Sequence, residues 1–204
     1  MMRIFGALCY LLLTFGTVLS AQGEEEIRRF DVEIEVEKDG DIVVTETIAV
    51  NVEGREIRRG IYRELPAFYE DDDGTGTLPY RYNVLSIRKD GRREPYDRER
   101  NGNAVVIRIG DPDRYLDYRV HAYEIRYREK HQLRYYEDRD ELYWNATGSY
   151  WLFPIRAASA RITLPDGAEV TQTDFYTGAF GASEQNANYR RVAGAHVVST
   201  TEPL

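Results

Sequence analysis

Two neighbouring carboxylates, Asp140 and Glu141, lie in the part of the sequence that is richest in aromatic residues. Two carboxylates that flank a glycosidic bond, with aromatic rings to hold the sugar, are the groups that a glycoside hydrolase needs. Successive residues of a β-strand point to opposite faces, however, so these two cannot both face one substrate if the segment is a strand. An envelope glycoside hydrolase that uses Asp140 or Glu141 is therefore the alternative function, and no residue is assigned as catalytic.

The same segment favours a contact surface as the main interpretation, because its aromatic side chains are interleaved with charged ones, as in protein interfaces. The aromatic residues are Tyr135, Tyr136, Tyr143, Trp144, Tyr150 and Trp151. Strand alternation sends Trp144 or Trp151 into the core. The predicted binding residues are Tyr136, Asp140, Glu141, Tyr143 and Tyr150, with Tyr143 and Tyr150 as leading candidates. The alternative is that all six rings only close the core.

Patterns for other catalytic chemistry or for metal binding are missing. One cysteine excludes a multi-cysteine metal site, and His121, His131 and His196 show no repeated metal-binding spacing; we interpret His121 as a strand-face residue. The acidic segments 71–73 and 111–113 offer oxygen ligands for calcium, but neither has the spacing of an EF-hand loop, so both are interpreted as solvated loops. We therefore expect no metal and no cofactor.

The charge of the chain argues against nucleic acid as a partner. Its 204 residues include 27 lysine and arginine residues against 35 aspartate and glutamate residues, which gives a net charge of −8. Nonspecific binding to nucleic acid needs a basic surface that displaces counterions from phosphates.

The N-terminal residues have the pattern of a secretory signal peptide. A basic start precedes an apolar run over residues 4–19, and small residues separate that run from an acidic segment. We predict a signal peptide over residues 1–23, cleaved between Ala21 and Glu24. The alternative is an uncleaved membrane anchor. Cleavage removes Cys9, the single cysteine, so the mature chain cannot be a thiol enzyme.

After this segment, apolar and polar residues alternate with the period of a β-strand. Residues 30–36 and 42–52 alternate on either side of a turn at 38–41, which predicts a β-hairpin. The further strand candidates are residues 57–65, 84–89, 95–100, 104–109, 120–129, 142–145, 158–164, 170–176 and 196–200. This pattern predicts an all-β fold, with one antiparallel β-sandwich-like domain over residues 24–204 after the signal peptide helix.

One carboxylate, Glu46, falls on the apolar face of the second predicted strand. A buried carboxylate costs on the order of several kcal/mol unless it is paired. We therefore predict that Arg58, Arg59 or Arg63 pairs with Glu46. The alternative is a β-bulge that turns Glu46 outward.

Four segments carry a resemblance to a known family. They are residues 59–66, residues 107–113, residues 140–148 with Trp151 and Ile155 beyond them, and residues 176–181. Their residues and their order along the chain resemble the N-terminal module of a bacterial family of predicted membrane proteins, domain of unknown function 2207. The resemblance spans about residue 27 to the C-terminus and implies a module that continues, in family members, into transmembrane helices. It implies no catalytic residue and no ligand.

Together these patterns predict an exported, non-catalytic module in the periplasm, outside the cell or on the outer face of the cytoplasmic membrane. Its expected partner is an envelope protein or glycan; the resemblance implies membrane association, although we expect no transmembrane span in the mature chain. Because the family has a further strand after a turn like that at 202–204, we expect the module to end short of its last strand. An open sheet edge near the C-terminus would follow.

Overall fold

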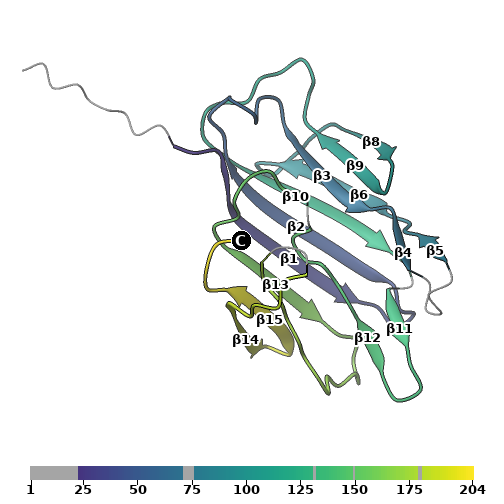
Figure 1. Cartoon of the computed structure of the whole chain (residues 1–204). Helices are drawn as coiled ribbons and strands as arrows, with labels where there is room; N and C mark the ends of the chain where they lie inside the picture. The colour runs from purple at the N-terminus through teal and green to yellow at the C-terminus, as the bar shows by residue number, and fades with distance from the viewer. Residues whose placement is uncertain (1–22, 71–75, 131, 149, 179–180) are drawn as a thin grey trace, which may run out of the picture.

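A computed structural model gives the fold of the chain (Figure 1). It describes residues 23–70, 76–130, 132–148, 150–178 and 181–204. The predicted signal peptide up to residue 22, the acidic segment 71–73 and His131 lie outside the described residues. Within the described ranges, no helix is long and apolar enough to cross a membrane.

The strands form one large sheet and three small ones. The large sheet has eight strands in the order β14-β15-β13-β1-β2-β10-β6-β7. These strands are β1 (Glu26–Val36), β2 (Ile42–Asn51), β6 (Asn83–Lys89), β7 (Arg92–Arg93), β10 (Val120–Glu129), β13 (Ala158–Thr163), β14 (Ala187–Val192) and β15 (Ala195–Thr200). The small sheets are β3-β9-β8, β4-β5 and β11-β12. Their strands are β3 (Ile61–Pro66), β4 (Phe68–Glu70), β5 (Thr77–Pro79), β8 (Tyr96–Asn101), β9 (Ala104–Ile109), β11 (Leu133–Tyr135) and β12 (Asp140–Leu142).

The predicted hairpin is formed by β1 and β2, which pair antiparallel on either side of the turn at residues 38–41. Buried and exposed residues alternate along most of both strands, as the period of two predicts. The same alternation runs through β10, which pairs with β2 over its whole length. These three strands form the centre of the large sheet.

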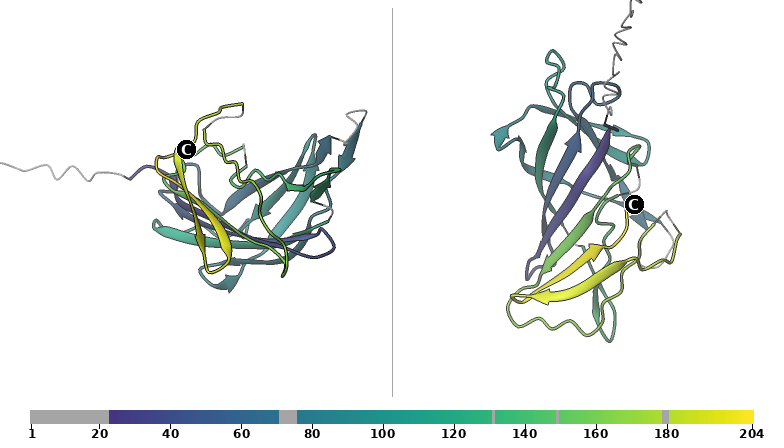
Figure 2. Two further views of the ribbon diagram at one scale, coloured as in Figure 1. Left: turned by 90° about the horizontal axis from the view of Figure 1, so that it is seen from below. Right: turned by 90° about the vertical axis from the view of Figure 1, so that its left-hand side faces the viewer.

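The core lies between the inner face of the large sheet and the three-stranded sheet. Alternate side chains of β1, β2 and β10 join one apolar cluster with Ile61, Leu65, Ile107 and Ile109 of β3 and β9. Figure 2 shows the large sheet curving into a trough. The predicted all-β, sandwich-like single domain is therefore confirmed. Its pairing is antiparallel except between β1 and β13, the one parallel pair among the named strands.

Three strand predictions differ from the structure. The strand predicted over 57–65 begins only at Ile61, because the N–H of Ile57 bonds to the Glu25 carboxylate and the carbonyl of Arg58 accepts the N–H of Leu116. The strand predicted over 142–145 lies earlier, as β12, and residues 143–145 form a loop. Residues 170–176 form no strand; they are mostly exposed, and both edges of β13 are already occupied by β1 and β15.

The C-terminal residues add a short backbone pairing to the sheet. Leu204 exchanges two hydrogen bonds with Ile155, at 2.8 and 3.0 Å, and Ile155 forms a parallel bridge with Ile27. The strand predicted over 196–200 is β15, which is paired on one side with β13 and on the other with β14. The strand at this edge of the large sheet is therefore β14.

A polar cluster ties the tight turn between β6 and β7 to β10. Asp90 and Gly91 form this turn with φ angles of 51° and 76°. Asp90 Oδ1 accepts the N–H of Ala122 at 3.0 Å, and Oδ2 lies 2.8 Å from Nδ1 of His121, a buried residue of β10. Burial raises the pKa of Asp90, but hydrogen bonds from Ala122, His121 and Arg119 outweigh it and lower that pKa to about 2.

This cluster predicts a loss of stability in acid. The pKa of Asp90 lies below its unfolded value of about 3.9, so the ionised group stabilises the fold above pH ~4, and this contribution is lost as the pH falls to ~2. We expect Asp90→Asn to be less stable than the wild type near neutral pH and to lose less stability between pH ~4 and ~2. Urea unfolding across this range tests it, with the exposed Glu35→Gln as control. Equal pH dependence of wild type and D90N would contradict the prediction.

Candidate functional site

The polar centre of the core is an ion pair between Glu46 of β2 and Arg63 of β3. The Nε and Nη2 atoms of Arg63 each donate to one carboxylate oxygen of Glu46, both at 2.7 Å. The Glu46 side chain is 0% exposed and the Arg63 side chain is 2% exposed. The predicted pairing is confirmed, with Arg63 as the partner and no bulge at Glu46.

Neighbouring groups complete the hydrogen bonding of this pair. Tyr127 of β10 donates its hydroxyl to Glu46 Oε1 at 2.8 Å, and Arg63 Nη1 donates to the carbonyl of Glu64 at 3.0 Å. Burial alone would lower the pKa of Arg63, but the charge and hydrogen bonds of Glu46 outweigh it and raise that pKa. Burial, with the charge of Glu46, raises the pKa of Tyr127 well above its usual value. The arginine therefore stays charged and the tyrosine stays neutral.

The tryptophan-bearing segment closes over the ion pair. The Arg63 guanidinium lies 5.8 Å from the ring of Trp151 and 5.5 Å from that of Phe30, and the two rings meet edge to face at 5.7 Å. Trp151 Nε1 donates to the carbonyl of Thr147 at 2.8 Å. A Cβ on Gly148, whose φ is 79°, would lie 2.4 Å from Arg63 Nη1, so glycine is required there. Two of the resembling segments, 59–66 and 140–148, thus meet at one buried interaction.

The predicted binding residues lie mainly on the β11–β12 hairpin and the loop after it, at one end of the large sheet (Figure 1). Leu133, Leu142 and Trp144 pack against the core and anchor this hairpin. The residues around these anchors form what we call the aromatic surface. Its members are Tyr135, Tyr136 and Tyr143 with the charged residues Arg134, Asp138, Arg139 and Asp140. Tyr135 and Asp140 lie on the same face of the hairpin as Leu133 and Leu142, and Arg134 lies on the opposite face.

The exposure of the aromatic rings agrees with the directions predicted for them, although the strand predicted over 142–145 is not formed there. Tyr143 is 64% exposed and Tyr150 is 53% exposed, while Trp144 and Trp151 are half-buried against the core. The Arg134 guanidinium lies 5.7 Å from the ring of Tyr143, which ties this loop residue to the hairpin. Among the described residues, no hydrogen bond or ring contact joins Tyr150 to the aromatic surface.

The two candidate acids do not form a catalytic pair. Asp140 and Glu141 are successive residues of β12, the first exposed and the second half-buried. Their partners in the β-ladder are Tyr135 and Arg134, respectively. Their side chains therefore point to opposite faces of the hairpin, which leaves no site between two carboxylates for a glycosidic bond.

The family assignment of the chain follows from comparison with known proteins. The model of the N-terminal domain of predicted membrane proteins, DUF2207, matches residues 26–202. The chain belongs to this family. A relative, the uncharacterized protein YciQ of Escherichia coli strain K12, is 30% identical over 190 residues, which cover 87% of this chain and 30% of the relative. The chain thus spans less than a third of that relative's length.

Solved structures show that the fold also occurs outside DUF2207. Leukotriene A4 hydrolase from Saccharomyces cerevisiae superimposes with a TM-score of 0.52 at 10% identity, over 88% of this chain and 27% of that chain. The complex of the yeast enzyme with bestatin gives a TM-score of 0.51 at 10% identity, with the same coverage. At these identities the likeness concerns the fold alone.

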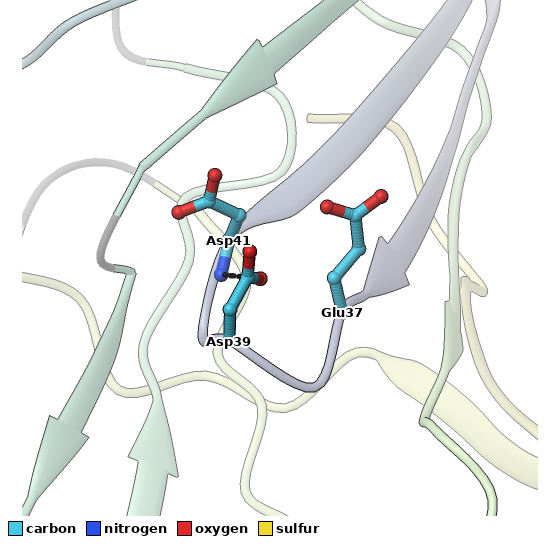
Figure 3. Close-up of side chains that lie close together, drawn as sticks. All are labelled: Glu37, Asp39 and Asp41. Atoms are coloured by element: carbon cyan, nitrogen blue, oxygen red, sulfur yellow. Dashed lines mark hydrogen bonds between the residues drawn. The ribbon is translucent and has the colours of Figure 1, made fainter.

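The DUF2207 module also has a cluster of three carboxylates that the sequence analysis missed. Glu37, Asp39 and Asp41 surround the turn between β1 and β2, and one oxygen of each lies within 4.8 Å of the others (Figure 3). The signal was their spacing, since they occupy every second position. Arg128 of β10 donates to both carboxylate oxygens of Glu37 and lies 3.9 Å from Asp41. This arginine already supplies a positive charge to the cluster.

The other calcium candidate of the sequence, at residues 111–113, is a local turn. Asp111 Oδ1 accepts the backbone N–H of Asp113 at 2.9 Å. This hydrogen bond is typical of an aspartate that stabilises its own loop.

A second carboxylate of the inner face, Glu129, has no salt bridge or hydrogen bond in the described part of the chain. Glu129 is fully buried at the end of β10, and both of its oxygens lack a hydrogen-bond partner. The nearby Tyr82 donates its hydroxyl to the carbonyl of Pro66 instead, at 2.9 Å. Burial raises the pKa of Glu129 to about 9, so the side chain is a neutral carboxylic acid near pH 7.

The ion pair predicts strongly non-additive mutations. Arg63→Met leaves the Glu46 carboxylate buried without a cation, which should lower the free energy of unfolding by about 3–5 kcal/mol. Adding Glu46→Gln removes the orphaned charge and should restore much of the loss. Urea unfolding of both single variants and the double variant measures the coupling. Additive losses would show that the two side chains do not act as a pair.

Glu129 predicts a loss of stability toward alkaline pH. Its pKa in the folded protein, about 9, lies above the unfolded value of about 4.3, so folding takes up a proton between these values and stability falls as the pH rises through them. Glu129→Gln abolishes this proton uptake. The variant should gain stability relative to wild type from pH ~5 to ~9, by at most about 1.4 kcal/mol per pH unit. Thermal unfolding of both proteins across this range measures the effect; parallel curves would contradict it.

Proposed function

We propose that this module is an exported, non-catalytic interaction domain of the cell envelope, and that its aromatic surface binds a protein partner. The observation that carries the proposal is the exposure of Tyr135, Tyr136 and Tyr143, on and directly after a hairpin that Leu133 and Leu142 anchor to the core. Exposed tyrosines on an anchored element supply contact area at a low entropy cost, and the charges around them set the orientation of the partner.

The rings favour a protein over a glycan as the partner. Arg134 lies over the ring of Tyr143 at 5.7 Å, and Arg139 lies over the ring of Tyr136 at 4.8 Å. A sugar that stacks on an aromatic platform needs an open ring face, and the guanidinium over each of these rings leaves only one face for stacking. The arginines also keep donors beside the rings that match carboxylates of a protein partner.

Site-specific crosslinking in the intact envelope tests the proposal. A photo-reactive phenylalanine at position 135 or 143 should give a defined protein adduct, while the same residue at Tyr176, which is also exposed, should not. Adducts at all three positions, or at none, would argue against a protein-binding surface here.

A paired substitution separates binding from folding. Tyr135→Ser with Tyr143→Ser removes two exposed rings, so the free energy of unfolding should change by about 1 kcal/mol or less. The adduct formed from a reactive residue at position 136 should disappear in this background. Tyr96→Ser with Tyr176→Ser is the matched control and should leave the adduct intact. Polysaccharide binding that the first pair abolishes would instead identify a glycan, and loss of folding would assign the tyrosines to the core.

A further inference from the structure

Two of the resembling segments meet at a place that the aromatic surface does not use. Residues 59–62 and 108–112 run side by side where the β3–β9 ladder begins. A Cβ on Gly60 would lie 1.8 Å from the carbonyl oxygen of Ile109, and a Cβ on Gly110 would lie 2.0 Å from that of Arg59. The two backbones therefore touch, and only glycine fits at either position.

A surface cavity of about 220 Å³ opens beside this contact. Three arginines, Arg58, Arg59 and Arg108, line it together with the acidic residues Glu56 and Asp111. Arg108 forms an ion pair with Asp97. Among the described residues, neither Arg58 nor Arg59 forms a salt bridge with a carboxylate, so two positive charges of the cavity have no ion-pair partner in that part of the chain.

Both of these arginines are held in place by other contacts. Arg58 Nε donates to the carbonyls of Arg55 and Gly54, at 2.9 and 3.3 Å, which leaves its terminal nitrogens available. Arg59 lies over the ring of Tyr115 at 4.4 Å and donates to its hydroxyl at 2.8 Å. A guanidinium positioned in this way presents a fork of donors that matches phosphate oxygens.

The loop that carries Arg58 and Arg59 is fastened to the start of β1. The Glu25 carboxylate accepts the backbone N–H groups of residues 53, 55, 56 and 57, at 2.7 to 3.3 Å. Arg55 Nη2 donates to the carbonyl of Gly23 at 2.6 Å. The cavity is thus built on a loop that is braced against the residues just before β1.

We propose that this cavity binds a phosphate group through Arg58 and Arg59. The chemistry is common to a lipid headgroup and to a free phosphate. Membership of a family of predicted membrane proteins favours the lipid source, and so do the exposed rings of Tyr62, Tyr115 and Tyr118 near the cavity, because tyrosine is typical of the membrane interface.

Vesicle flotation of the full chain tests the proposal. Phosphatidylcholine vesicles that also contain phosphatidylglycerol should bind the protein, and Arg58→Gln with Arg59→Gln should weaken this binding about 30-fold, since each arginine at an anionic surface contributes ~1 kcal/mol. Arg190→Gln with Arg191→Gln on β14 removes the same charge at the edge of the sheet and should leave binding unchanged. Thermal unfolding checks that each variant is folded.

Two further measurements decide whether the phosphate belongs to a lipid or is free, and whether a negative charge in the cavity weakens binding. Isothermal titration with inorganic phosphate should show little heat if the lipid is the source; saturable binding that depends on Arg58 and Arg59 would instead identify free phosphate. Glu56→Gln removes a negative charge from the cavity and should strengthen vesicle binding about 5-fold. Vesicle and phosphate binding that are both insensitive to Arg58 and Arg59, or an equal loss in the β14 control, would overturn the proposal.

Discussion

The buried ion pair of Glu46 and Arg63 is the constraint around which this DUF2207 module is assembled. A carboxylate at the middle of the central strand β2 is unfavourable in an apolar core unless a cation meets it with full hydrogen bonding. Arg63 of the three-stranded sheet is this cation, so the two sheets can pack in only one relative position that leaves no buried charge unpaired. The same guanidinium holds the Gly148 loop and the ring of Trp151 against Phe30. One interaction thus joins segments that are far apart in the sequence.

Because these interior groups are satisfied or buried, ligands and partners can reach only the surface of the module. Arg63 donates to Glu46 and to the carbonyl of Glu64, Tyr127 donates to Glu46, and Glu129 is buried as a neutral acid, so none of these three polar side chains of the inner face is open to a ligand. The yeast hydrolase that shares the fold does not alter this conclusion, since function resides in sites that different proteins build on a common fold. In this chain the exposed tyrosines of the β11–β12 hairpin and the arginines beside Gly60 are such surface features.

How far the sequence predicts the structure depends on whether the deciding information is local. Alternation within a strand tells which face a side chain takes, so the buried position of Glu46 could be predicted. The three candidate arginine partners of Glu46 could also have been narrowed to Arg63, because Ile61, Arg63 and Leu65 share one face of β3. The same argument extended by one step would have placed Glu129 inside, after Tyr127. Alternation does not tell which strands become neighbours, so the parallel pairing of β13 with β1 was not predictable. Residues 170–176 have strand-forming side chains, but both edges of β13, the strand before them, are already paired with β1 and β15.

The two surface features lie at opposite ends of the central strands. The hydroxyl of Tyr135 lies close to Gly40 in the turn before β2, whereas the loop of Arg58 and Arg59 follows the end of β2. A strand of ten residues is about 33 Å long, so one surface cannot influence the other through direct contact. The strands β1, β2 and β10 are paired along their length, and the ion pair lies midway along β2. This pairing makes the body between the two ends stiff. On the two proposals made above, the module would hold a protein partner at a set distance from a phosphate-bearing surface, and this arrangement depends on the stiffness of the body between them.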